Sequence, residues 1–126
     1  MDVVKVKYYT RDLVTQKKSC LFIFGDNLQK FGRGGQAIIR DLPNAYGIPT
    51  KKYPSQMENS FFSDDEYEVN ISHIKQAIDT MSLEKYTHVV FPEDGLGTGL
   101  AELPKRAPKT YAFLVNYINQ KFGTVY

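Results

Sequence analysis

Short apolar runs alternate with longer segments of helical periodicity along this chain. Runs rich in β-branched and aromatic residues predict β-strands over residues 3–9, 21–24, 45–50 and 87–91. The second run is continuously apolar, which is typical of a central strand that is covered on both faces. Pro49 removes a backbone donor from the third run, so we expect a sheet edge or a strand end there.

Two later segments carry apolar residues at helical spacing. Residues 69–81 predict a helix in which Asn70 serves as the N-cap. Residues 107–122 give the clearest pattern, with Pro108 in the first turn and Gly123 as the C-terminal stop. We therefore expect two long amphipathic helices that pack on the sheet.

The segments between these elements are shorter or more polar. Residues 36–42 predict a short helix that ends before Pro43. Residues 10–18 are polar and are expected to form a turn. Residues 51–66 predict a long surface loop, and long loops in compact domains are often functional.

The alternation of strands and helices predicts an α/β fold with a mostly parallel or mixed sheet between helices. The length of 126 residues favours a single domain over residues 1–126. Apolar residues make up 42% of the chain, which is enough to fill a core and argues against a disordered chain. No apolar run approaches the ~20 residues of a membrane helix, so we expect no membrane partner. The N-terminus lacks the pattern of a secretory signal.

The charge and the metal-binding residue types exclude several classes of site. Cys20 is the only cysteine, which excludes an intrachain disulfide and is compatible with a reducing cytoplasm. His73 and His88 lie far apart with no evident third ligand, so we expect no metal site. The net charge is only +2, and a group of acids opposes a basic groove, which makes a nucleic-acid partner unlikely. These acids are Glu58, Asp64, Asp65, Glu66 and Glu68.

Two glycine-rich stretches follow directly on apolar strands. They are residues 32–35 and 95–99. In parallel sheets, ligands bind beyond the C-terminal ends of the strands, so both stretches are expected along one rim. Glycine lets the backbone approach a ligand, and successive amides bind anions. Two such cradles suggest a diphosphate, although the alternative that the glycines only form tight turns stays open.

Asp26 and Asn27 follow the central strand directly. A short polar pair at this position could hydrogen-bond ribose hydroxyls. The alternative is an Asx turn or a helix cap, the commoner use of these residues. The local sequence leaves both interpretations open.

Four stretches of the chain carry a resemblance to a known family. Residues 22–28 (FIFGDNL) and 31–37 (FGRGGQA) resemble the macrodomain pattern of a strand, an Asn-containing loop and a glycine-rich helix start. Residues 45–51 (AYGIPTK) and 91–101 (FPEDGLGTGLA) are similar to the next strand and to the second phosphate loop of compact macrodomain-like proteins of phages and bacteria. The resemblance extends from about residue 21 to residue 122.

The resemblance implies a three-layer α/β/α sandwich with a mixed, mostly parallel sheet and a cleft for ADP-ribose or a related NAD-derived nucleotide. In that family the Asn of the first loop contacts the distal ribose, which points to Asn27 with Asp26 beside it. Phe31 is a candidate to cover the distal ribose or the adenine. The residues that would hold the diphosphate are Gly34, Gly35, Gly95, Leu96, Gly97, Thr98 and Gly99.

The resemblance also suggests a hydrolase that removes ADP-ribose from a modified macromolecule, without a cofactor. Lys51 matches the catalytic Lys of some related macrodomains, but Ala101 stands where those proteins have an Asp. Glu93 and Asp94 could instead polarise a water near the distal ribose. The competing hypothesis is a non-enzymatic interaction or nucleotide-sequestering protein. Its contact surface would be the aromatic residues in and beside the long loop, Tyr53, Phe61, Phe62 and Tyr67.

Overall fold

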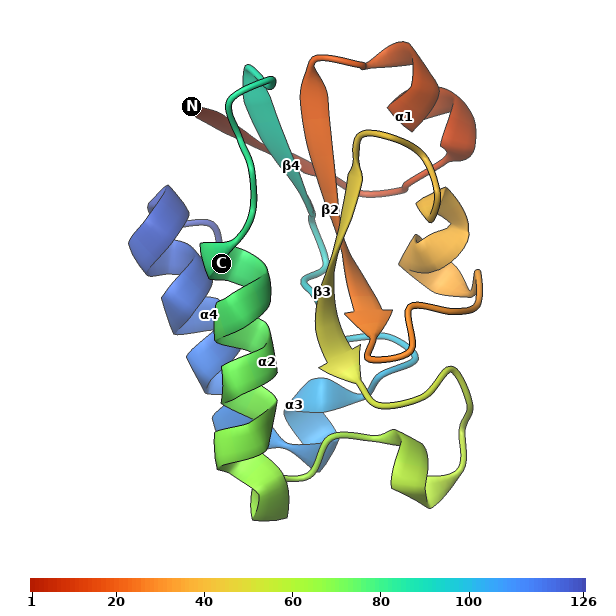
Figure 1. The fold of residues 1–126 in the computed structure, drawn as a ribbon, viewed down its shortest axis with the longest axis vertical. Helices are drawn as coiled ribbons and strands as arrows, with labels where there is room; N and C mark the ends of the chain where they lie inside the picture. Colours follow the sequence, from red (N-terminus) through yellow and green to blue (C-terminus); the bar gives the residue numbers. More distant parts are fainter.

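A four-stranded parallel sheet with strand order β1-β4-β2-β3 forms the centre of the computed structural model, which describes residues 1–126 (Figure 1). The strands are β1 (Asp2–Val6), β2 (Cys20–Asn27), β3 (Ala45–Lys51) and β4 (His88–Pro92). All three pairings are parallel, so the predicted α/β fold is confirmed and the sheet contains no antiparallel strand. β3 lies at one edge, as Pro49 predicted.

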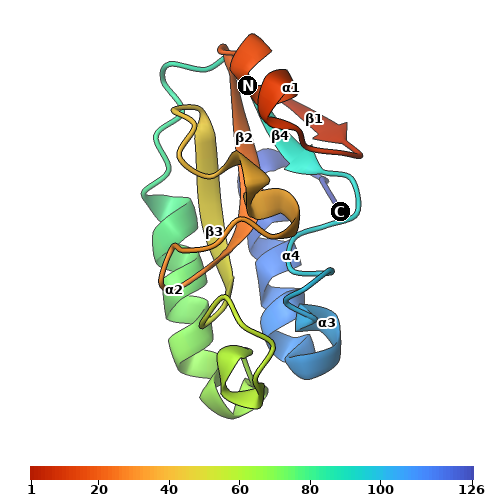
Figure 2. The same cartoon turned by 90° about the vertical axis from the view of Figure 1, so that its right-hand side faces the viewer.

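β2 shows why its sequence is continuously apolar. Successive side chains of a strand point to opposite faces of the sheet. Leu21 and Ile23 belong to the larger core cluster, which includes α2 (Tyr67–Asp79) and α4 (Pro108–Phe122). Phe22 and Phe24 belong to a smaller cluster on the opposite face. Helical segments therefore cover both faces of the sheet (Figures 1 and 2).

The smaller cluster is covered by two short helical segments. These are α1 (Arg11–Gln16) and the 3-10 helix η1 (Gly35–Ile39). The predicted turn over residues 10–18 is therefore wrong, because it contains α1, whose N-cap Thr10 accepts a hydrogen bond from the Leu13 amide at 3.1 Å. The predicted helix over residues 36–42 is shorter and tighter than expected. A further short helix, α3 (Leu103–Arg106), had no clear periodic pattern.

The two long helices match the sequence pattern with one correction. α4 begins at Pro108 and ends before Gly123, whose φ of 84° suits glycine. α2 begins earlier than predicted, at Tyr67, so Asn70 is not its N-cap. Asn70 is buried instead, and its amide donates to the Ser63 carbonyl at 2.8 Å and to the Thr110 hydroxyl at 3.2 Å. It ties the start of α2 to α4.

Two of the four aromatic residues that the competing hypothesis places on a contact surface are buried, whereas Tyr53 is 41% exposed and Tyr67 is partly exposed. Phe61 and Phe62 are 3% and 1% exposed. Phe61 forms an isolated antiparallel bridge with Lys51, and Phe62 joins the larger core cluster. Two 3-10 turns, Glu58–Ser60 and Asp64–Glu66, also lie between β3 and α2. No helix is both long enough and apolar enough to cross a bilayer.

The order of the strands creates a crevice at one end of the sheet. The chain reaches β2 and β3 over the face of α1 and η1, and returns to β4 over the face of α2. The connections that follow β2 and β4 therefore leave toward opposite faces, and ligands bind at such points. β2 and β4 pair only over Cys20–Phe22. Beyond that stretch, the Tyr9 hydroxyl lies 2.7 Å from the Ile23 carbonyl and 3.1 Å from the Val90 carbonyl.

Candidate functional site

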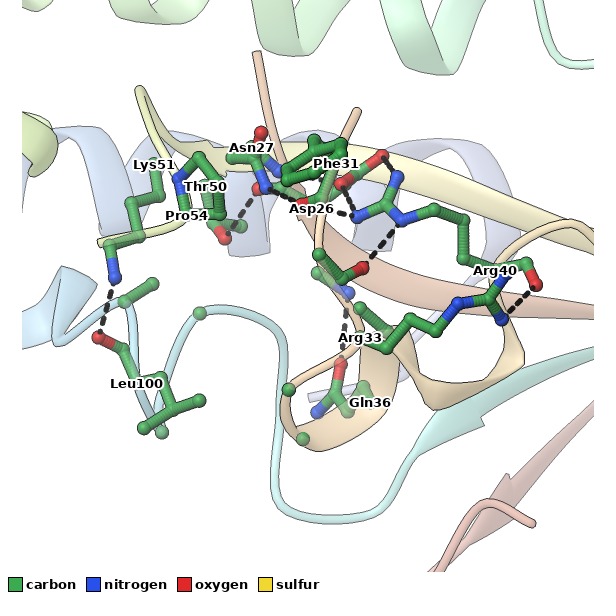
Figure 3. A pocket seen from close by; sticks show the side chains of 18 of the residues that line it. Asp26, Asn27, Phe31, Arg33, Gln36, Arg40, Thr50, Lys51, Pro54 and Leu100 are labelled. Carbon is green, nitrogen blue, oxygen red and sulfur yellow. Dashed lines mark hydrogen bonds and ion pairs between the residues drawn. The ribbon is translucent and has the colours of Figure 1, made fainter. Parts of the chain in front are cut away.

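A cavity of about 490 Å³ lies at the C-terminal ends of β2 and β3 (Figure 3). This volume falls within the roughly 300–1,000 Å³ of small-molecule sites. Besides the strand ends, its walls come from residues 31–37, 54–56 and 99–101. Three segments that are distant in sequence therefore enclose one space.

The two glycine loops meet beside this cavity. A Cβ atom added to Gly34 would lie 3.1 Å from Cδ1 of Leu100, and one added to Gly25 would lie 3.3 Å from the Gly97 amide nitrogen. The Gln36 side chain joins the same regions, because its oxygen accepts from the Gly25 amide at 2.9 Å and its nitrogen donates to the Gly95 carbonyl at 3.0 Å. The expected common rim is thus found. No local pattern in the sequence pointed to this role of Gln36.

Of the amides in residues 32–35 and 95–99, only that of Gly95 has an acceptor within the protein, the Pro92 carbonyl. The acceptor-free amides include those of Gly34, Gly35, Gly97 and Gly99, all of which line the cavity. Unpaired amides of adjacent loop residues are suited to bind an anion. A helix dipole adds little, because η1 is one short 3-10 segment instead of the predicted helix. The anion-binding capacity therefore rests on the amides themselves.

Gly97 and Gly99 differ in what they tolerate. Gly97 has a φ of 75°, and a Cβ there would lie 3.0 Å from Cβ of Thr50 and 3.1 Å from Cβ of Leu103. A side chain at position 97 would therefore disturb the fold. Gly99 has nothing within 4 Å of an added Cβ and no positive φ. A side chain at position 99 would instead occupy open space beside the cavity.

Asp26 is held by an arginine that sequence reasoning missed. Arg40 contacts both carboxylate oxygens, at 2.5 and 3.1 Å, and Arg40 Nε donates to the Gly32 carbonyl at 2.7 Å. The Asn27 amide also donates to the carboxylate, at 2.8 Å. A Cβ on Gly47 would lie 2.6 Å from Asp26 Oδ2, so this neighbour in β3 must be glycine. The pair thus fixes the first loop.

Asn27 shapes the same loop with its carboxamide. Its Nδ2 donates to the Phe31 carbonyl at 2.7 Å, and its Oδ1 accepts from the Gln29 amide at 3.0 Å. This is the Asx-turn alternative, and one N–H of the carboxamide remains without an acceptor in the protein. The Phe31 side chain is 69% exposed and lines the cavity.

Lys51 carries a cation into the cavity. The residue is 7% exposed, and Nζ makes one hydrogen bond, to the Leu100 carbonyl at 3.4 Å (Figure 3). Nζ also lies 4.7 Å from the centre of the Phe61 ring. Burial lowers the pKa of Lys51; the charge of Glu102 opposes that shift and the charge of Arg106 adds to it.

Five of the predicted site residues lie outside the cavity. They are Glu93, Asp94, Gly95, Leu96 and Thr98. The Asp94 carboxylate is exposed and pairs with Nζ of Lys7 at 2.9 Å. The Glu93 amide donates to the Val6 carbonyl, so this turn lies beside β1 and away from β2. Leu96 is 1% exposed and packs in the larger core cluster.

The other predicted residues are brought together. Those that line the cavity are Asp26, Asn27, Phe31, Gly34, Gly35, Lys51, Gly97 and Gly99. Arg33, Arg40 and Gln36 line it as well and were not predicted. The Arg33 guanidinium binds the Asp41 carboxylate at 2.9 Å. No three His, Cys, Asp or Glu side chains are grouped to hold a metal ion.

Comparison with other proteins places the chain in a family. Neither the curated proteins nor the solved structures contain a match. The model of a family of unknown function (DUF7831) matches residues 4–117, which is more than half of the 126 residues. The chain therefore belongs to the DUF7831 family of unknown function.

Proposed function

We propose that the protein binds ADP-ribose or a related nucleotide in this cavity, with the diphosphate on the amides of both glycine loops. The observation that carries the proposal is the meeting of two loops whose amides at Gly34, Gly35, Gly97 and Gly99 have no acceptor in the protein. Three cationic side chains and one carboxylate line the cavity, which favours an anionic ligand.

The ligand extends from the amides toward the exposed ring of Phe31. An aromatic face that is 69% exposed at a cavity offers a surface on which a base or a ribose packs. The free N–H of Asn27 would reach a ribose hydroxyl beside it. The proposal includes a macrodomain-like, three-layer α/β/α arrangement, which helices on both faces of the sheet support.

The features of the cavity favour binding without catalysis over hydrolysis. Asp26 is the only carboxylate that lines the cavity, and Arg40 holds both of its oxygens. Ala101 lines the cavity where related hydrolases have an Asp. A hydrolase that removes ADP-ribose from a macromolecule would have to rely on Lys51, since Glu93 and Asp94 lie elsewhere. Sequestration of a free nucleotide is therefore the form of the proposal that we favour.

Titration calorimetry with ADP-ribose tests the proposal. The wild-type protein is expected to release heat on binding, and Gly99→Val is expected to weaken binding at least about tenfold by filling the open space beside the loop. Thr98→Ser is the control, because it changes the same loop outside the cavity and keeps the hydroxyl that donates to the Asp94 carbonyl. Absence of heat with folded wild-type protein at millimolar ADP-ribose would contradict the proposal, as would equal binding by wild-type protein and Gly99→Val.

A further inference from the structure

Lys51 is the cavity's one cation that no carboxylate neutralises. Arg40 is bound to Asp26, and Arg33 is bound to Asp41. The ammonium of Lys51, in contrast, makes a single long hydrogen bond to a carbonyl, although the residue is 7% exposed. Two of its three donor hydrogens have no partner in the protein.

Glu102, the acidic group whose charge acts on Lys51, is already paired with another cation. Glu58 binds Arg106 at 2.8 Å, and Glu102 binds it at 3.4 Å. The Arg106 guanidinium lies 3.7 Å from the centre of the Phe61 ring, the same ring that Lys51 approaches. Two cations therefore share one aromatic ring, and the carboxylates pair with only one of them.

An ammonium that is partly removed from water and has no counter-charge costs the fold stability. That cost is offset when a ligand brings a negative group into the cavity. We infer that Lys51 binds an anionic group of the ligand separate from the diphosphate, so that the cavity takes nucleotides whose end opposite the base carries its own phosphate or carboxylate. This inference rests on the proposed function, because it assigns the diphosphate to the glycine loops.

Leu100 relates the two binding regions to each other. Its carbonyl accepts the hydrogen bond from Lys51, and its side chain lies against Gly34. In Figure 3 the Lys51 side chain runs toward Leu100, away from Asp26 and Arg40. A diphosphate over Gly34 and Gly99 thus leaves Lys51 for the next charged group along the ligand.

Two matched pairs of probes test this inference. ADP and ATP, without added divalent cation, differ by one phosphate. ADP-glucose and ADP-glucuronate differ by one carboxylate. We expect wild-type protein to bind the more anionic member of at least one pair about tenfold more tightly, which corresponds to one added charge-assisted contact. The pair that responds identifies the anion as phosphate or carboxylate.

The variants Lys51→Met and Lys52→Met make the test specific. Lys52 lies one residue away, pairs with Glu66 and does not line the cavity, so its variant removes the same charge without touching the site. Lys51→Met is expected to abolish the preference for the anionic member, and Lys52→Met is expected to retain it. Thermal unfolding of both variants checks that each is folded.

Four results would overturn the inference. Equal binding of both members of each pair by wild-type protein would mean that the cavity holds no separate site for an anion. An undiminished preference in Lys51→Met would mean that another group binds the anion. An equal loss of affinity for all four probes in that variant would mean that Lys51 contacts the diphosphate itself. Failure of folded wild-type protein to bind any of the four probes would contradict the proposed function as well, so this failure is distinguishable from the other three.

Discussion

Lys51 and Lys52 are adjacent in the sequence, yet the structure gives them opposite environments. Lys52 pairs with Glu66, whereas Lys51 enters a cavity without a carboxylate partner. The sequence singled out Lys51 only through its resemblance to a catalytic lysine. Its burial was not predictable, because residues from distant segments form the cavity around it. The missing counter-ion was not predictable either, because Glu102 pairs with Arg106, far along the chain. The sequence was therefore sufficient to select Lys51 as a candidate site residue, but not to predict the groups that surround its ammonium.

The lowered pKa of Lys51 predicts opposite pH effects on folding and on binding. In the unfolded chain the ammonium regains its usual pKa of 10.5, so the unfolded state binds the proton more tightly. Between the lowered pKa and 10.5, this group therefore makes the unliganded protein more stable as the pH rises. Binding of an anion changes in the other direction, because deprotonation removes the charge that attracts it.

Affinity for the preferred anionic probe, measured as the pH is raised from neutral toward 10.5, checks this expectation. Wild-type affinity should fall over this range, and the affinity of Lys51→Met should stay nearly constant. Glu102 and Arg106 are the charged groups whose fields act on Lys51, and Arg106 remains charged because its ion pair with Glu58 raises its pKa. Parallel pH profiles of the two proteins would contradict a role for the Lys51 charge.

At the scale of elements, the loop after β2 depends on one ion pair. Arg40 follows η1 and reaches back to Asp26 at the end of β2 and to the carbonyls of Phe31 and Gly32. The loop thus acquires its shape from a residue outside it. The succession of a strand, glycines and a helix predicted where the loop begins. It could not predict the pairing of Arg40 with Asp26, because the two residues are fourteen positions apart.

Arg40→Met alone should destabilise the protein more than Arg40→Met combined with Asp26→Asn. Arg40→Met leaves the buried Asp26 carboxylate without its counter-charge, which is expected to lower the free energy of unfolding by about 3 kcal/mol. Asp26→Asn in the same chain should recover part of that loss, since a neutral amide is cheaper to bury. Urea denaturation of the single and double variants measures this. A double variant less stable than Arg40→Met alone would show that the unpaired Asp26 charge is not the main cause of the lost stability.

The elements themselves were predictable to the extent that their signals are local. The continuous apolar run at residues 21–24 predicted β2, because a strand that is buried on both faces needs apolar residues in succession. The periodicity of α4, with a proline at its start and a glycine at its end, predicted that helix from neighbouring residues alone. Asn70 was misassigned because its partners, Ser63 and Thr110, come from other segments. α1 was missed because it spans only six residues.

At the scale of the whole molecule, strand order decides which predicted site residues meet. β2 lies between β3 and β4, so the ends of β2 and β3 and the loop after β4 surround one space. The rule that ligands bind at the C-terminal ends of parallel strands predicted this rim from the sequence alone. It did not predict that Glu93 and Asp94 turn toward β1, because the position of β1 beside β4 was unknown. The position of the cavity at the strand ends was therefore predictable. Which residues of the loop after β4 line the cavity, and which lie beside β1, was not.

If the two glycine loops form one binding site, a nucleotide must affect both at once. Amides at residues 34, 35, 97 and 99 have no acceptor in the protein, so they are expected to exchange rapidly with deuterium in the absence of ligand. Saturating ADP-ribose should slow exchange in residues 31–36 and 97–101 together, while residues 93–95, which lie outside the cavity, keep their rates. Amide exchange read by NMR resolves these positions individually. Protection confined to one loop would mean that the ligand spans only half of the proposed diphosphate site. If that loop is residues 31–36, Gly99→Val should leave its protection unchanged, because Gly99 lies in the other loop.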